Sequence, residues 1–219
     1  VVTVPPVNKP GTIYLYSNAG YAIAGAMAEK VTGVPWEDLL RDKIFTPLGI
    51  TSGGFGAPGM SGKVDEPWGH TTTGKPVEPG PNADNPPAIG PAGTVHMTLG
   101  DWAKFIALHL RGDAANPARQ VKLLIAASFD ELHRPQPGPS GDGYAAGWGV
   151  TTRNWANGGR PGDTGRVLTH AGSNTMWYCV VWIAPEKNLA FLAATNQGGD
   201  DAGTACDQAV AAMIQKYLK

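Results

Sequence analysis

Residues 175–195 restrict the fold more than any other part of the chain, because they contain an apolar segment that has no polar face. Its alternating positions are apolar on both sides, with Trp177, Cys179 and Val181 on one and Met176, Tyr178, Val180 and Trp182 on the other. Such a strand has to be covered on both sides, so we expect it at the centre of a sheet with helices packed against it. The Pro-Glu-Lys-Asn turn at 185–188 then returns the chain in a second strand, which predicts an antiparallel hairpin.

Helical patterns flank this hairpin in the sequence. Apolar residues recur at helical spacing after Asn18 until Gly33, and either Ser17 or Asn18 is suited to cap the start. Thr98 and Asp101 form a start similar to a capping box for a further helix. The expected helices span residues 18–32, 35–46, 98–112, 117–133 and 202–218, and residues 143–150 are expected to form one more strand. Helices, then a hairpin, then a closing helix indicate an α+β fold.

Composition and spacing argue against several classes of function. The 219-residue chain has a formal net charge of −1 and no Lys/Arg cluster, which argues against a nucleic-acid partner. No apolar run is long enough for a membrane span, and the start of the chain does not resemble a signal peptide. Cys179 and Cys206 allow either one disulfide or two separate buried thiols, and the sequence leaves both open.

Three motifs that could hold a ligand or a nucleophile fail on inspection. Residues 69–75 have the Gly-x4-Gly-Lys spacing of a phosphate loop, but Pro76 replaces the required Ser or Thr, so a surface loop is favoured. The five histidines lack zinc-ligand spacing, and no Gly-x-Ser-x-Gly elbow occurs. We therefore expect no metal and no organic cofactor.

Three segments, at 10–50, 90–110 and 170–199, carry a family resemblance. Together they resemble the serine β-lactamase and penicillin-binding-protein-like superfamily, which includes class C β-lactamases, DD-peptidases and esterase-like serine hydrolases. The resemblance implies a β-lactamase/transpeptidase-like fold, with residues 1–140 as the remainder of a helical domain with long cleft-lining loops. Residues 141–219 would supply antiparallel sheet strands and the C-terminal helix.

The Tyr-Ser-Asn triplet at 16–18 matches the Tyr-x-Asn motif of this superfamily, which faces the nucleophile. A free phenol titrates near pH 10 and is a poor base, but beside cations it can take a proton from serine and return it to the leaving group. The resemblance implies this role for Tyr16, and it implies that Asn18 hydrogen-bonds a catalytic amine and a substrate carbonyl. The simpler interpretation is that Tyr16 packs and Asn18 only caps the helix.

His170-Ala171-Gly172 stands where the superfamily has Lys-Thr-Gly or a variant on the strand beside the cleft. The resemblance implies that His170 points into the cleft and that Gly172 lets substrate lie against the strand. The backbone N–H of Ser173 would be half of an oxyanion hole, where one donor contributes about 3–4 kcal/mol. Ala171, Gly172, Asn174 and Trp68 are the expected substrate-binding residues. Trp68 lies in the irregular segment 46–96, whose aromatic residues either line the cleft or pack loops onto the body.

Histidine in place of lysine changes the expected electrostatics. A lysine supplies a fixed positive charge, whereas an imidazole is charged only below a pH of about 6.5. Since His-x-Gly members include D-peptidases and esterases, the variant weakens a specific assignment as a β-lactamase. We expect an activity that depends on a group titrating between pH 5 and 8.

No serine in the chain is followed three residues later by lysine, so the Ser-x-x-Lys motif that carries the nucleophile is absent from residues 1–219. We expect a C-terminal portion of a serine hydrolase that forms an acyl-enzyme with an ester, a D-amino-acid peptide or amide, or a β-lactam. The alternative is a non-catalytic binding or regulatory relative.

The expected partners are a small-molecule or peptide substrate and the missing N-terminal segment of the fold. Without that segment the hairpin is expected to expose a wide apolar face and unpaired edges, so the polypeptide expressed alone is expected to aggregate or to bind the missing segment. A periplasmic or secreted location is suggested by the resemblance alone, because members of the superfamily are often exported.

Overall fold

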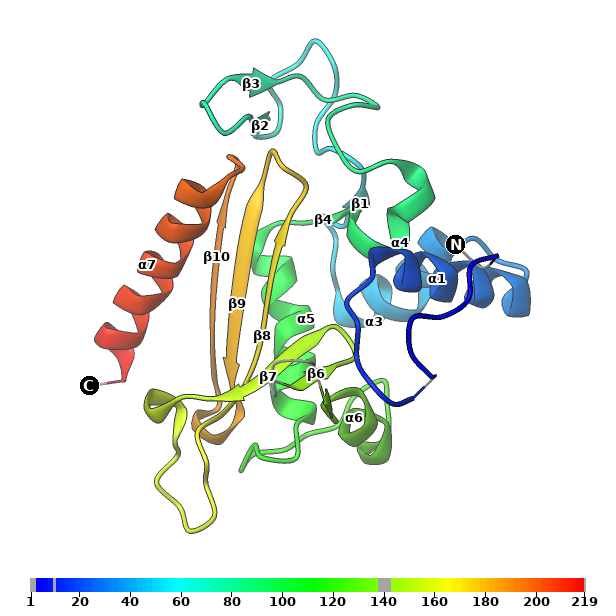
Figure 1. The fold of residues 1–219 in the computed structure, drawn as a ribbon. Coiled ribbons are helices and arrows are strands. Elements are labelled where there is room, and N and C mark those ends of the chain that lie inside the picture. Colours follow the sequence, from blue (N-terminus) through cyan, green and yellow to red (C-terminus); the bar gives the residue numbers. More distant parts are fainter. Residues whose placement is uncertain (1–2, 10, 138–142, 219) are drawn as a thin grey trace.

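The computed structural model describes residues 3–9, 11–137 and 143–218, and it has the expected α+β layout (Figure 1). Its centre is a six-stranded sheet in which every neighbouring pair of strands is antiparallel. In spatial order these strands are β10 (Leu189–Thr195), β9 (Tyr178–Ala184), β8 (Arg166–Ser173), β7 (Trp148–Thr152), β6 (Gly143–Ala145) and β5 (Gln136–Pro137). Two short strand pairs lie outside this sheet: β1 (Gly54–Phe55) with β4 (Val95–His96), and β2 (Gly69–His70) with β3 (Pro76–Val77).

The helices contribute the layers around the sheet. They are α1 (Asn18–Thr32), α2 (Trp36–Leu40), α3 (Thr46–Leu48), α4 (Gly90–Gly93), α5 (Leu99–Gly112), α6 (Ala126–Leu132) and α7 (Asp200–Tyr217). A π-helical segment, Arg41–Phe45, joins α2 to α3, and short 3-10 turns occupy Pro87–Ile89, Asn154–Ala156 and Pro185–Lys187. No helix in the described ranges has the length and apolar character needed to cross a membrane.

The central position predicted for the apolar strand is confirmed, because β9 pairs with β8 on one side and β10 on the other. Its two faces belong to different cores. Val181 and Ile183 pack with Ile106 and Leu110 of α5, whereas Val180 packs with residues of α7. Figure 1 shows α7 and α5 on opposite faces of the hairpin. Both faces are therefore covered, and the prediction that the hairpin exposes a wide apolar face is wrong.

Exposed apolar side chains gather instead on α1, none of whose residues is buried. They include Tyr21, Ile23, Met27 and Val31, the last of which is 85% exposed. The helix begins as expected, since the Ser17 hydroxyl accepts a hydrogen bond from Gly20 N at 3.2 Å, and Gly33 ends it in the left-handed conformation. α1 is held mainly through α4.

Two predicted elements differ from the structure. The expected strand at 143–150 is two strands, β6 and β7, because the chain turns at Gly147 with φ +82°. The expected helix at 117–133 forms only over 126–132. Before it, the side chains of Asp113 and Asn116 accept hydrogen bonds from backbone N–H groups two residues ahead, which favours turns over a helix.

Two other predicted helices lie close to their predicted bounds. The helix expected to end before Pro47 continues to Leu48, since Pro47 lies in the first turn of α3, where it removes no needed donor. The helix at 98–112 is confirmed as α5, and the Thr98 hydroxyl accepts a hydrogen bond from Asp101 N at 3.3 Å.

Cys179 and Cys206 are both free thiols. The predicted domain boundary at 140/141 lies outside the described residues and stays a prediction.

Candidate active site

Tyr16 and Asn18 stand on either side of the residue that caps α1. The Tyr16 hydroxyl donates a hydrogen bond to Asn18 Oδ1 at 3.0 Å, and the Tyr16 side chain is 54% exposed. Ser17 cannot join them, because its hydroxyl is committed to the helix cap. The cap thus directs the phenol and the amide to the same outer side of the helix start, where both are available to a ligand.

The end of β8 offers an open backbone edge. β7 pairs with β8 only over Arg166–Thr169, whereas β9 pairs with it as far as Ser173. In the described part of the chain, residues 170–173 therefore have no strand on the β7 side. Because alternate backbone groups of a strand point toward that side, this edge can accept an extended ligand as an added strand. The segment is His170-Ala171-Gly172-Ser173, the one singled out by the sequence.

The structure brings His170 and Tyr16 together from distant parts of the sequence. Their ring centroids are 6.5 Å apart, and the ring of Tyr144 on β6 lies 6.0 Å from each of them. The Tyr144 hydroxyl is 3.0 Å from His170 Nε2, within hydrogen-bond distance. A second tyrosine, Tyr14, stacks on Tyr144 with centroids 4.4 Å apart and planes 11° apart.

Burial sets the protonation states in this aromatic cluster. It lowers the pKa of His170 below its ordinary value of 6.5, although the backbone of Ala171 acts in the opposite direction. Burial also raises the pKa of Tyr144 well above that of a free phenol, and the neighbouring phenols of Tyr21, Tyr14 and Tyr16 raise it further. At neutral pH the cluster therefore presents an uncharged imidazole and a phenol that keeps its proton.

Sequence reasoning missed Tyr144. The strand pattern in 143–150 was visible, but nothing in a single sequence shows which residue of β6 meets the end of β8. Tyr144 is paired with Gly149 of β7, and Gly149 is paired with Thr169. This register across three strands brings Tyr144 next to His170, and it depends on the turn at Gly147.

Ser173 and Asn174 have side chains that are engaged within the chain. The Ser173 hydroxyl donates to Trp177 O at 2.7 Å and accepts from Thr175 N at 3.0 Å. Asn174 Oδ1 accepts from Trp177 N, and its amide donates to Asp84 Oδ1 at 2.8 Å. Ser173 thus has only its backbone to offer a ligand, and Asn174 holds the β8–β9 turn and ties it to the 46–96 segment.

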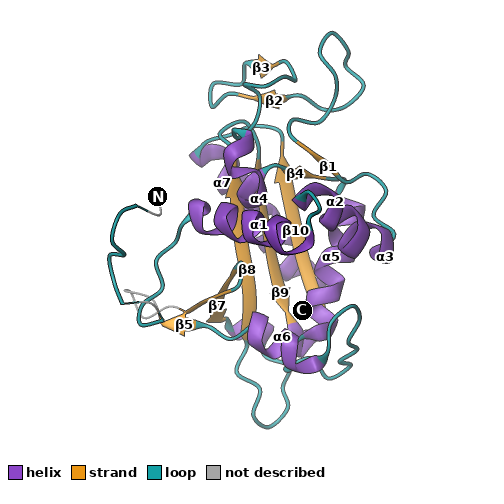
Figure 2. Ribbon diagram, turned by 90° about the vertical axis from the view of Figure 1, so that its right-hand side faces the viewer, coloured by secondary structure: helices purple, strands orange, loops and turns teal. Residues whose placement is uncertain are grey.

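Trp68 belongs to a loop that covers the same end of the sheet, where Figures 1 and 2 both show β2 and β3. Its indole N–H donates to Lys63 O at 3.0 Å, and its carbonyl accepts from Asn196 Nδ2 at 2.8 Å. Next to it, His70 Nδ1 lies 2.9 Å from Asn196 O, and His70 N donates to Met176 O. These contacts pack the loop onto the sheet through the Trp68 backbone and His70, and the role of the Trp68 side chain in substrate binding stays a prediction.

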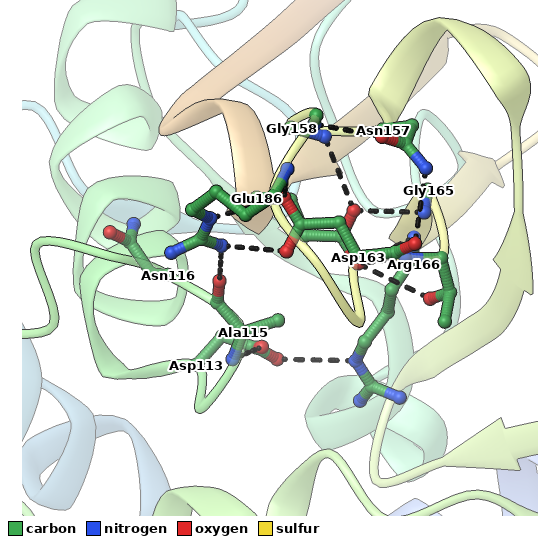
Figure 3. A network of polar contacts seen from close by, with 12 residues as sticks. Asp113, Ala115, Asn116, Asn157, Gly158, Asp163, Gly165, Arg166 and Glu186 are labelled. Atoms are coloured by element: carbon green, nitrogen blue, oxygen red, sulfur yellow. Dashed lines mark hydrogen bonds and ion pairs between the residues drawn. The ribbon is translucent and has the colours of Figure 1, made fainter.

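A second polar network fixes the start of β8 (Figure 3). The buried carboxylate of Glu186 accepts hydrogen bonds from the backbone N–H groups of Thr164 at 2.9 Å and Gly165 at 2.8 Å. Arg166, the first residue of β8, lies 3.6 Å from Asp113 and donates to His133 O at 2.7 Å. Within the described residues no group of three or more His, Cys, Asp or Glu is arranged to hold a metal ion.

Comparisons with known proteins give the family. The model of the family described as Beta-lactamase matches residues 1–213, nearly the whole chain. The chain belongs to the β-lactamase family. This family is one of serine hydrolases and penicillin-binding proteins, and the match confirms the resemblance seen in the three sequence segments.

Similar members of the β-lactamase family are longer than this chain. Penicillin-binding protein 4 of Amycolatopsis lactamdurans is 30% identical over 194 residues, which are 86% of this chain and 49% of that protein. The unguisins hydrolase ungD' of Aspergillus campestris is 29% identical over 70% of this chain and 30% of its own length. The octameric penicillin-binding protein homologue from Pyrococcus abyssi has the same fold, with a TM-score of 0.71, 22% identity and coverage of 97% of this chain and 45% of its own. The chain spans half or less of the length of these relatives.

Proposed function

We propose that the protein is a serine hydrolase that forms an acyl-enzyme with an ester, a D-amino-acid peptide or amide, or a β-lactam. The observation that carries this proposal is the convergence of Tyr16 and Asn18 with the open edge of β8 at His170. Tyr16 is exposed, its hydroxyl is hydrogen-bonded to the Asn18 side chain, and its ring centroid lies 6.5 Å from that of His170. A proton acceptor beside an unpaired strand edge is the arrangement that acyl transfer needs.

In this proposal each residue has a defined task. Tyr16 takes the proton of the attacking hydroxyl and later returns it to the leaving group, and Asn18 orients Tyr16 and the substrate carbonyl. Gly172 allows the substrate backbone to approach β8, and the Ser173 N–H donates to the oxyanion that forms in the transition state. Ala171 borders the same edge, Asn174 holds the adjoining turn, and Trp68 closes the end of the sheet. The nucleophile is a serine of a Ser-x-x-Lys motif outside residues 1–219.

A covalent serine probe tests the proposal on the full-length protein. We expect a fluorophosphonate to add one label, detected by intact mass, on a serine that is followed three residues later by lysine. Tyr16→Phe keeps the ring and removes the proton acceptor, so labelling is expected to slow by about 100-fold or more. Tyr217→Phe, on α7, is the matched control and is expected to label at the wild-type rate. If no serine is labelled while the protein remains folded, the non-catalytic binding role takes the place of the hydrolase.

A further inference from the structure

The side chain of Tyr144 is fixed by two tyrosines from the N-terminal part of the chain. Its ring stacks on the ring of Tyr14 and packs edge-on against the ring of Tyr16, at an interplanar angle of 89°. Its backbone is fixed in β6 by pairing with Gln136 and Gly149. With ring and backbone both fixed, the hydroxyl has little freedom, and it lies 3.0 Å from His170 Nε2.

We propose that Tyr144 is a positioning residue that donates its hydroxyl proton to His170 Nε2. This bond holds His170 as the neutral tautomer with its proton on Nδ1, and it fixes the plane of the imidazole beside Tyr16. The importance for catalysis rests on the proposed function, whereas the tautomer itself does not. The site then offers a substrate an oriented, uncharged hydrogen-bonding group where lysine-containing relatives have a fixed charge.

The direction of the hydrogen bond follows from its surroundings. Burial lowers the pKa of His170 and raises that of Tyr144, so at neutral pH the imidazole is unprotonated at one nitrogen and the phenol retains its proton. A half-buried hydroxyl needs an acceptor for that proton. The Tyr21 phenol also hydrogen-bonds Tyr144 and helps to raise its pKa, so it is the competing partner, whereas His170 Nε2 lies 3.0 Å from the Tyr144 hydroxyl.

The opposite arrangement would place a proton on Nε2 and make the phenol oxygen the acceptor. The phenol proton would then pass to the Tyr21 hydroxyl, the other hydrogen-bond partner of Tyr144, and His170 would keep no proton on Nδ1. The backbone of Ala171 raises the pKa of His170, as a carbonyl that accepts from a ring N–H does, and Nδ1 is the nitrogen left for that bond because Nε2 faces Tyr144. The Nδ1–H tautomer therefore satisfies both groups, and it is the one that the geometry favours.

Long-range ¹H–¹⁵N spectra of the full-length protein, labelled with ¹⁵N-histidine, test the proposal at pH 7.5. The two nitrogens of a neutral imidazole differ strongly in shift according to which one carries the proton. We expect His170 to show a protonated Nδ1 and an unprotonated Nε2 in the wild type. Tyr144→Phe keeps the stacked ring and removes the donor, so a population with the proton on Nε2 is expected to appear.

Tyr21→Phe is the matched control, since it removes a neighbouring phenol and leaves the bond to His170. It is expected to keep the wild-type tautomer. The resonances of the buried pair His109 and His133, which lie in a separate network, report that each variant is folded. A wild-type proton on Nε2, an unchanged tautomer in Tyr144→Phe, or a changed tautomer in Tyr21→Phe would overturn the proposal.

Kinetics then separate positioning from stability. Loss of one hydrogen bond that orients His170 is expected to lower kcat of Tyr144→Phe by about tenfold with little change in KM. If kcat is unchanged although the tautomer moves, the positioning role fails while the hydrolase remains. If the serine probe labels nothing, the proposed hydrolase fails while the spectra still decide the tautomer.

Discussion

Glu186→Gln provides a strong test of how the start of β8 is held. The residue is 6% exposed, and its carboxylate accepts from Thr164 N and Gly165 N, one on each oxygen, at 2.9 and 2.8 Å. Weaker contacts come from Gly158 N and Arg166 N at 3.4 Å. A carboxylate satisfies all of these donors at once, whereas a carboxamide has only one acceptor oxygen.

The magnitude follows from the geometry of the amide. Whichever way the introduced carboxamide is oriented, its NH₂ group faces one of the two short backbone N–H donors and cannot accept from it. One charge-assisted bond, worth about 1.5–3 kcal/mol, is lost, and one buried donor is left unpaired at a cost of about 1–3 kcal/mol. We expect a loss of about 3 kcal/mol in the free energy of unfolding, because relief of carboxylate desolvation offsets part of the sum.

Urea denaturation of the full-length protein, followed by tryptophan fluorescence, measures this loss. With an m-value of about 3 kcal/mol/M, the midpoint is expected to fall by about 1 M at unchanged m. Glu131→Gln is the matched control, since that side chain is 65% exposed and its pair with Arg134 contributes about 0–1 kcal/mol. If both variants shift the midpoint equally, the carboxylate does not hold the loop.

The same pair of proteins gives a pH dependence with a defined sign. Burial raises the pKa of Glu186, but the backbone donors of Thr164, Gly165, Arg166 and Gly158 lower it by more, so the net shift is below its ordinary value of 4.5. A carboxyl with a lowered folded-state pKa contributes stability above its unfolded pKa and loses it as the pH falls through the folded value. The difference between wild type and Glu186→Gln is therefore expected to shrink below a pH of about 4.5.

Two further predictions concern activity and assembly. Burial lowers the pKa of His170, and the titratable groups that face it are the phenols of Tyr16 and Tyr144. The rate of hydrolysis is therefore expected to rise with pH as His170 loses its proton below pH 6.5, and then to level off. A wild-type profile that is flat from pH 5 to 8 and matches that of His170→Ala would contradict this. Residues 1–219 expressed alone are expected to self-associate through the exposed apolar side chains of α1, as measured by light scattering, and a monodisperse monomer that unfolds cooperatively would refute this.

The parts of the fold that the sequence predicted are those with strong local patterns. α1 and α5 have helical periodicity and capping residues, and the apolar strand at 178–184 has a composition that only a doubly covered position accommodates. The errors arose where a single side chain or a single glycine determines where a helix or a strand ends. Asx-type bonds from Asp113 and Asn116 shortened a helix, and a positive φ at Gly147 divided a strand.

The candidate site was predictable only as far as its motifs extend. Tyr16, Asn18 and His170 were located from the family resemblance, and the structure brings their rings and amide together. Tyr144 carries no motif, since its significance comes from strand register and not from its neighbours in sequence. The same holds for Asn174, whose amide and carbonyl could serve a ligand but bind the turn and Asp84 instead.

The two ends of β8 explain how an open edge can coexist with a fixed site. At its start, Arg166 is held through its backbone to Glu186 and through its side chain to His133 O, and Leu168 is fully buried in the core. β8 is paired with β7 over residues 166–169 and with β9 over residues 168–173, so it has partners on both sides at Leu168 and Thr169, while beyond Thr169 it is paired only with β9. The anchored half can thus fix the direction of the free half, which must leave its backbone groups unpaired to receive a ligand. The hydrogen bond from Tyr144 to His170 lies one residue beyond Thr169, where the pairing of β8 with β7 ends. There a side-chain contact takes the place of backbone pairing, and the backbone edge of β8 stays open.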